Sequence, residues 1–169
     1  MQTWRVLTVI LALGGLVPAS AAQEPAPFRP VAELIANPRL ADAAVAFANP
    51  ERPVIYYNPS LLREVGPELA AFLLAHEEGH IVYRHQRPDR SRFIVAALET
   101  LLQRYELEAD CYAAGRLSVE RPEAVARAIE YFRSLGSFRA DREHPTGAER
   151  SARIIACLGS VYGAGVDPG

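Results

Sequence analysis

The sequence contains no lysine, because all 18 basic residues among its 169 are arginine. This absence excludes catalysis through a Schiff base and any other chemistry that needs a lysine amine. The 20 acidic residues nearly balance the basic ones, and no run of five like charges occurs. A basic footprint for nucleic acid and a polybasic patch for membrane surfaces are therefore excluded as well.

Long hydrophobic runs are also lacking. The uncharged stretch over residues 6–17 is shorter than the roughly 20 residues that a membrane-spanning helix needs. One positive charge precedes it, and small residues up to Ala22 follow it, which is typical of a secretory signal peptide. We predict that residues 1–22 are a signal peptide and that the protein is periplasmic or secreted, without a stable membrane span. A permanent membrane anchor is the weaker alternative.

Cysteine is scarce too, since only Cys111 and Cys157 are present. An even pair of cysteines in an exported chain favours a disulfide. The alternative is that both are small buried hydrophobic residues, because spacing alone does not show whether their Cα atoms come close enough for a bridge.

The length suits one domain, and a hydrophobic content of 50% is enough to bury a core. We expect an extended, proline-rich arm over residues 23–30 and a single domain over residues 31–169. Residues 31–36 suggest a short helix. Two apolar runs, 43–48 and 54–57, flank a turn rich in Asn and Pro and predict a β-hairpin.

Helices are expected to follow this hairpin. Apolar residues spaced three and four apart predict helices over residues 68–85, 91–117 and 123–135. A last helix begins at Thr146, whose hydroxyl and the Glu149 carboxylate can form a capping box, and residues 161–169 form a frayed tail. The predicted class is α+β, with a small sheet or hairpin followed by a helical core.

Three of the four histidines lie within ten residues of each other, and two of them belong to the sequence HEEGH over residues 76–80. This is an instance of the H-E-x-x-H pattern. Residues four apart on a helix share a face, so His76 and His80 can bind one metal ion with Glu77 beside them. Zinc suits two neutral nitrogen donors, and a catalytic site keeps a position for water. The motif predicts one Zn²⁺ per chain, with Glu77 taking a proton from that water; the alternative is two surface histidines.

A third protein ligand is required, and the next predicted helix offers Glu106, Glu108 and Asp110. Glu106 and Asp110 are four apart and share a face, whereas Glu108 points elsewhere. One of the facing pair can bind the metal, and the other can accept the free ring N–H of a histidine ligand. The spacing does not decide between them, and a solvated acidic face is the alternative for both.

Three stretches together resemble the gluzincin metallopeptidases: LLAHEEGHIVYRH from Leu73, YELEADCYAAG from Tyr105 and HPTGAERSARI from His144. That family includes the type I CAAX prenyl proteases, the HtpX-like heat-shock proteases and soluble periplasmic relatives, and the small minigluzincins are similar in scale. The resemblance covers roughly residues 54–158 and implies a zincin-like helical core. The larger members carry transmembrane helices or repeat domains, for which this sequence gives no signal.

The resemblance also implies roles for individual residues. It implies Glu106 as the third zinc ligand and Asp110 as the residue that supports a ligand. It suggests that His144 and Arg150 face the cleft, where they would stabilise the oxyanion formed when water attacks a peptide carbonyl. The alternatives are loop chemistry for His144 and an internal salt bridge for Arg150.

Four further residues bear on the site. Glu78 lies at a position where the family usually has an apolar residue. We expect its carboxylate either near the site or on the solvated face of the helix, and we favour the solvated face. His85 is about 140° around the helix from His80, so we expect it to be structural or to bind a carboxylate. Tyr56 and Tyr57 either line the cleft on an edge strand or pack in the core.

The first hypothesis is a zinc-dependent endopeptidase that hydrolyses peptide bonds in exported or envelope proteins, so its partner is a polypeptide substrate. The second is a zinc-stabilised, non-catalytic peptide-binding protein or a latent zymogen, with a fourth ligand from residues 23–30 or from His144. Glu77 argues against the second hypothesis, because a structural site has no need of a general base.

Overall fold

The computed structural model describes residues 32–49, 51–85 and 94–163. The predicted signal peptide and arm lie outside these residues, as does the expected start of a helix at Ser91. The described part is an α+β structure of five helices and a three-stranded sheet. The predicted coarse class is therefore confirmed.

The sheet consists of β1 (Glu33–Ala36), β2 (Ala44–Phe47) and β3 (Val54–Tyr57), in the order β1-β3-β2. Strands β2 and β3 pair antiparallel, which confirms the predicted hairpin, and β1 pairs parallel to β3. The expected helix over residues 31–36 is wrong. Six residues are too few for a stable helix alone, and pairing with β3 supplies the backbone partners that an isolated helix would lack.

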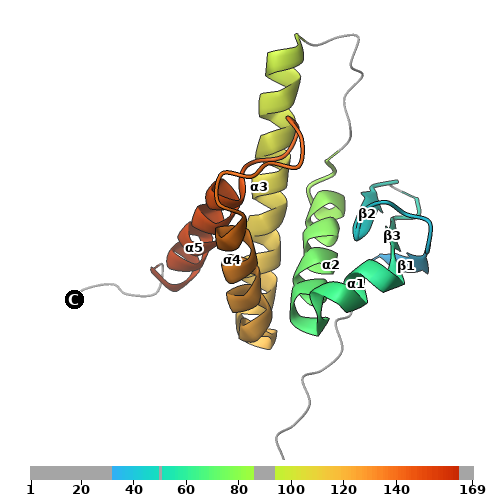
Figure 1. Ribbon diagram of the computed structural model, residues 1–169, viewed down its shortest axis with the longest axis horizontal. Coiled ribbons are helices and arrows are strands. Elements are labelled where there is room, and N and C mark those ends of the chain that lie inside the picture. The colour runs from blue at the N-terminus through green and yellow to red at the C-terminus, as the bar shows by residue number, and fades with distance from the viewer. Residues whose placement is uncertain (1–31, 50, 86–93, 164–169) are drawn as a thin grey trace, which may run out of the picture.

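Helix α2 (Pro67–Val82) is central: it packs against β2 on one side and against α3 (Val95–Glu120) and α4 (Pro122–Leu135) on the other (Figure 1). Helix α1 (Pro59–Val65) leads into α2. Helix α5 (Gly147–Gly163) packs against α3 and α4. None of the described helices is both long and apolar enough to cross a membrane.

The four helices predicted after the hairpin are present as α2, α3, α4 and α5, and their ends differ from the predicted ones by a few residues. Helix α2 stops at Val82 rather than near His85, and α5 continues to Gly163, into the stretch expected to be frayed. The predicted capping box is confirmed, because the Thr146 N–H donates to the Glu149 carboxylate at 2.7 Å and the Glu149 N–H donates to the Thr146 hydroxyl at 3.2 Å.

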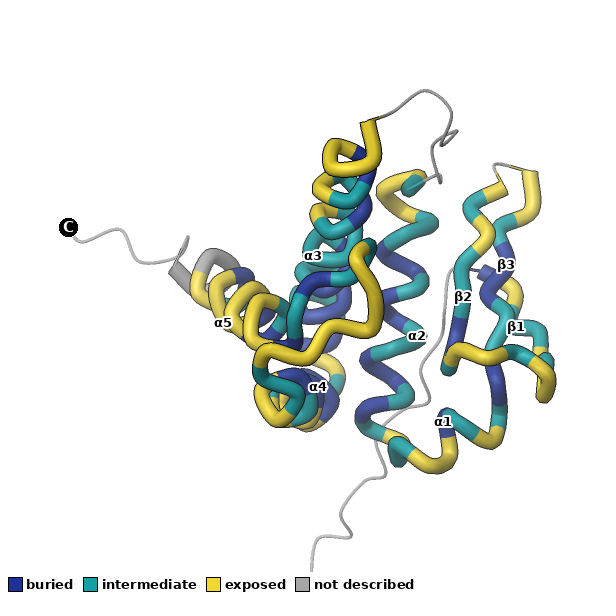
Figure 2. The backbone as a smooth tube through the Cα atoms, turned by 45° about the horizontal axis from the view of Figure 1, so that its top comes forward, coloured by how far each residue is buried: buried dark blue, intermediate teal, exposed yellow. Residues whose placement is uncertain are grey.

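The main core lies between α2, α3, α4 and α5, and buried residues recur along α2 (Figure 2). A second, smaller core lies where α2 meets the sheet, around the fully buried Ile55. Helix α2 is therefore fixed on two sides, and its motif residues are held between the two cores. The largest buried hydrophobic side chains of the main core are Leu69, Phe72, Leu117, Phe132 and Ile154.

Gly79 lies where α2 approaches α3 most closely. A Cβ atom at this position would lie 2.9 Å from the Ala109 Cα, a backbone atom that cannot swing aside. We expect Gly79→Ala to separate the helices and to lower the free energy of unfolding by about 1–3 kcal/mol, the usual cost of overpacking. Urea denaturation tests this, with Gly115→Ala on α3 as control, because a Cβ at Gly115 meets open space. Equal stability of the two variants would contradict the close approach.

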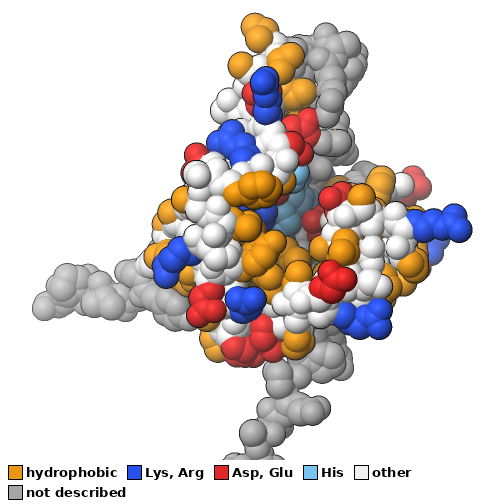
Figure 3. Space-filling view, in the orientation of Figure 1, with side chains coloured by type: hydrophobic (Ala, Val, Ile, Leu, Met, Phe, Trp, Pro, Cys, Tyr) orange, Lys and Arg blue, Asp and Glu red, His pale blue; other side chains and the backbone are white. Residues whose placement is uncertain are grey.

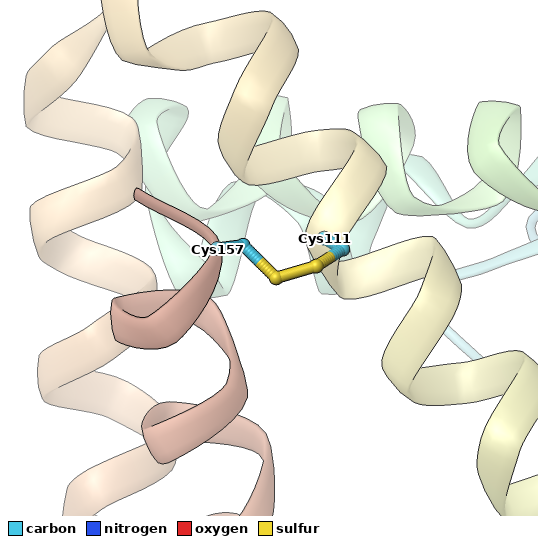
Figure 4. Close-up of a disulfide and its surroundings, with 2 residues drawn as sticks. All are labelled: Cys111 and Cys157. Carbon is cyan, nitrogen blue, oxygen red and sulfur yellow. A yellow bond between two sulfur atoms is a disulfide. The ribbon is translucent and has the colours of Figure 1, made fainter. Parts of the chain in front are cut away.

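A disulfide joins Cys111 on α3 to Cys157 on α5, with the two Cα atoms 5.6 Å apart (Figure 4). It closes a loop with a sequence separation of 46 residues. Breaking the bridge raises the conformational entropy of the unfolded chain. We therefore expect Cys111→Ser/Cys157→Ser to lower the free energy of unfolding by about 2–4 kcal/mol. Thermal melting of the oxidised, reduced and doubly substituted protein measures this. Equal melting temperatures for all three would contradict it.

Candidate metal centre

Side chains from two helices converge on one point beside the sheet. Helix α2 presents His76 and His80 one turn apart, and their Nε2 atoms lie 3.1 Å from each other. Glu106 reaches the same point from α3, with one carboxylate oxygen 3.2 Å from His76 Nε2 and the other 3.3 Å from His80 Nε2. Ligand atoms of these three residues all lie within 4.8 Å of one another, so together they form a possible metal-binding group.

The spacing of these donors fits a small tetrahedral ion. Ligands at about 2.0–2.1 Å from a tetrahedral centre lie about 3.3 Å apart, close to the separations seen here. Two neutral ring nitrogens that face each other repel through their lone pairs unless a proton or a cation lies between them. The donor set of two imidazoles and one carboxylate is one that zinc accepts.

Asp110 and Arg150 support His76 from behind. The Asp110 carboxylate lies 2.9 Å from His76 Nδ1, and it accepts from Arg150 Nε at 2.8 Å and from Nη2 at 2.6 Å. Asp110 is fully buried, and the Arg150 guanidinium also stacks on Phe132, 4.0 Å from the ring centroid. With His76 Nδ1–H donating to Asp110, Nε2 carries the lone pair that a metal needs.

The surroundings of His76 are strongly anionic. Burial lowers the pKa of His76, but the Asp110 and Glu106 carboxylates outweigh burial and raise the pKa to about 10. Burial raises the pKa of Glu106, but the hydrogen bond and charge of His76 hold it well below its ordinary value. A proton therefore occupies the cluster when no cation does. Such a centre would release that proton on binding a metal.

Glu77 lies beside this point and is held by the sheet. Its carboxylate accepts the backbone N–H of Ala46, on β2, at 2.7 Å. Burial raises the pKa of Glu77 to about 7. A carboxylate with a pKa near neutral is suited to take up and return a proton at physiological pH.

His144 lies at the margin of the centre, in the loop between α4 and α5. Its Nε2 is 3.9 Å from a Glu106 oxygen, its Nδ1 is 2.8 Å from an Asp141 oxygen, and its side chain is 37% exposed. The structure thus brings His144 to the centre, whereas Arg150 forms the internal salt bridge considered as its alternative. Figure 3 shows histidine side chains at the bottom of a hollow between the sheet and the helices.

The expectation that Glu78 lies on the solvated face is wrong. Glu78 is fully buried and forms an ion pair with Arg116 of α3. The reason is that α2 has no solvated face at this turn, since the sheet covers one side and α3 the other. The pair ties α2 to α3 next to the close contact at Gly79.

Two other expectations are resolved by the packing. His85 binds Glu108, as one of its alternatives proposed, with Nε2 at 3.0 Å from the carboxylate. Tyr56 and Tyr57 lie on β3, which is the central strand of the sheet, so the edge-strand interpretation is wrong for them. The strand at the edge beside the centre is β2.

Sequence reasoning missed the contribution of Ala46, because a backbone N–H leaves no trace in the residue type. It also missed the stacking of His85 on Tyr105, whose rings are 4.1 Å apart and tilted by only 9°. The sequence offered one signal for this cluster, since Tyr105 and Glu108 are three residues apart and therefore lie on one face of the helix.

Known proteins do not indicate what this group of residues does. No protein-family model matches the sequence, and neither a curated protein nor a solved structure matches it. The interpretation of the centre therefore depends on its own chemistry.

Proposed function

We propose that the protein is a zinc-dependent endopeptidase with a zincin-like core. The observation that carries this proposal is the convergence of His76 Nε2, His80 Nε2 and the Glu106 carboxylate at 3.1–3.3 Å, with Glu77 fixed beside them. Three protein ligands would leave a bound zinc ion one position for water or substrate, as in catalytic zinc sites. Membership of the gluzincin family and export of the chain belong to the same proposal.

Each residue has a defined part in hydrolysis. A bound zinc would act as a Lewis acid that lowers the pKa of water and polarises a peptide carbonyl. Glu77 accepts the proton of the attacking water and returns it to the amine that leaves. Asp110 keeps His76 in the tautomer that binds metal, and Arg150 holds Asp110 in place. His144, at the rim, supplies a hydrogen-bond donor for the oxyanion.

A polypeptide substrate is supported by the position of β2. The Ala43 carbonyl accepts the Asn58 N–H, so the backbone N–H and C=O groups of the odd-numbered residues in this segment point toward β3. The backbone groups of the even-numbered residues point away from β3, and the Ala46 N–H is donated to Glu77. The outward backbone groups of β2 thus border the centre. Because the Ala46 N–H is held by Glu77, an extended peptide added along this edge would pair with the other outward groups of β2 and would pass beside Glu77.

The test is cleavage of an unfolded protein such as casein by the purified protein, with and without a zinc chelator. We expect cleavage that the chelator stops and that added zinc restores. His80→Ala, which removes one donor, is expected to be inactive under all conditions. Chelator-insensitive cleavage, or none with zinc bound, would contradict the peptidase, and the second result would favour the zinc-stabilised binding protein or latent zymogen.

A further inference from the structure

His85 follows α2, yet it lies against the metal centre. Its side chain is only 4% exposed, and its Nδ1 lies 3.1 Å from Nδ1 of His80, the ring nitrogen that faces away from the three donors. Its Nε2 lies 3.0 Å from the Glu108 carboxylate. A continuous series of polar contacts thus runs from the His80 imidazole to the His85 imidazole and on to the Glu108 carboxylate.

The backbone is shaped to bring His85 back to this position. The Arg84 N–H donates to the Ile81 carbonyl at 3.1 Å and the His85 N–H donates to the His80 carbonyl at 2.9 Å, which together form a Schellman motif. Arg84 takes the left-handed position of the motif, with φ at 55°, where glycine is usual. A residue other than glycine in this conformation is uncommon, and the turn persists because its surroundings hold it.

The hydrogen bonds of this series can run in only one direction when His80 Nε2 binds a metal. Nε2 then carries no proton, so the His80 proton is on Nδ1 and is donated to His85 Nδ1. His85 must in turn carry its proton on Nε2, where Glu108 accepts it. The stack of His85 on Tyr105 fixes the plane of the accepting ring.

We propose that His85 is a positioning residue of the metal centre, which fixes the tautomer and ring orientation of His80 through the contacts His80–His85–Glu108. The inference rests on the proposed metal site. It gives each histidine ligand its own support: Asp110 with Arg150 behind His76, and His85 with Glu108 behind His80. Groups of this kind contribute about 10-fold to 100-fold to metal affinity.

The test compares zinc affinity, measured by competition with a chromophoric chelator, in variants of the purified protein. His85→Phe keeps an aromatic ring on Tyr105 but removes the acceptor, and we expect it to weaken zinc binding about 10-fold to 100-fold. His85→Asn places an amide oxygen near the position of Nδ1, and we expect it to retain most of the affinity. Glu130→Gln, on the exposed surface of α4, is the control and is expected to bind zinc like the wild type.

A second readout separates positioning from a merely structural role. With Co²⁺ in place of zinc, we expect the visible spectrum of His85→Phe to shift, because a reoriented His80 ring changes the ligand field, whereas His85→Asn keeps the wild-type spectrum. Unchanged affinity and spectrum in His85→Phe would overturn the inference and leave the proposed function intact. Equal losses in His85→Phe and His85→Asn would also overturn it.

The wild type provides a test that does not depend on folding of a variant. In ¹⁵N NMR spectra of the zinc-loaded protein, His80 is expected to bind metal through Nε2 and to carry a slowly exchanging proton on Nδ1. Metal binding through His80 Nδ1, or a rapidly exchanging proton there, would overturn the inference. Failure of the wild type to bind zinc at all would overturn both the inference and the proposed function.

Discussion

Glu77→Gln is expected to leave zinc bound and to lower kcat/KM for casein by about 10²- to 10⁴-fold, the usual contribution of a general acid–base group. Glutamine keeps the size of the side chain, and its amide oxygen can still accept the Ala46 N–H. It has no carboxylate to take up the proton of the attacking water. Zinc content and initial rates of cleavage, measured on the same preparation, test the two halves of this expectation.

The matched control is Glu130→Gln, the same chemical change on the exposed surface of α4, where the carboxylate is 71% exposed. We expect it to keep full activity and full zinc content. An active Glu77→Gln protein would contradict the role assigned to Glu77. Loss of zinc in Glu77→Gln would instead assign this carboxylate to metal binding.

The second large effect is expected at Asp110. Asp110→Ala leaves the Arg150 guanidinium, whose side chain is only 13% exposed, without its carboxylate partner. Removing one member of a buried ion pair costs about 3–5 kcal/mol of unfolding free energy. Because His76 also loses the acceptor of its Nδ1 proton, zinc affinity is expected to fall about 10-fold to 100-fold. Urea denaturation and zinc competition measure the two losses separately.

The double variant Asp110→Ala/Arg150→Met distinguishes these two roles. It removes both charges, so much of the stability is expected to return, whereas zinc affinity stays low because His76 still lacks its acceptor. Asp42→Ala, at an exposed position, is the control and is expected to change neither quantity. Wild-type zinc affinity in the double variant would show that Asp110 serves stability alone.

The candidate centre is largely predictable from the sequence because its residues follow helical spacing. The four-residue interval between His76 and His80 places both rings on one face, and the interval between Glu106 and Asp110 does the same on α3. Periodicity does not show which carboxylate approaches Nε2. The resemblance implied Glu106, and the packing of α2 on α3 agrees, since Glu106 contacts both Nε2 atoms and Asp110 contacts His76 Nδ1.

The errors occur where long-range contacts decide the outcome. Residues 33–36 form a strand because β3 supplies their hydrogen-bond partners, and nothing within those four residues shows this. Glu78 is buried because Arg116, 38 positions away in the sequence, meets it across the helix interface. A polar residue on a helix indicates a solvent-exposed position only when that side of the helix is not covered by other elements. The contact between Glu77 and the β2 backbone is equally invisible in residue types.

The metal centre is tested most directly by the zinc content of the purified protein, measured by mass spectrometry of the metal in the wild type and in His76→Ala, His80→Ala and Glu106→Ala. We expect one zinc per wild-type chain and a strongly reduced content in each variant, while Glu130→Gln keeps one. A wild type without zinc, or variants that retain a full equivalent, would contradict the assignment of these three residues as the metal ligands.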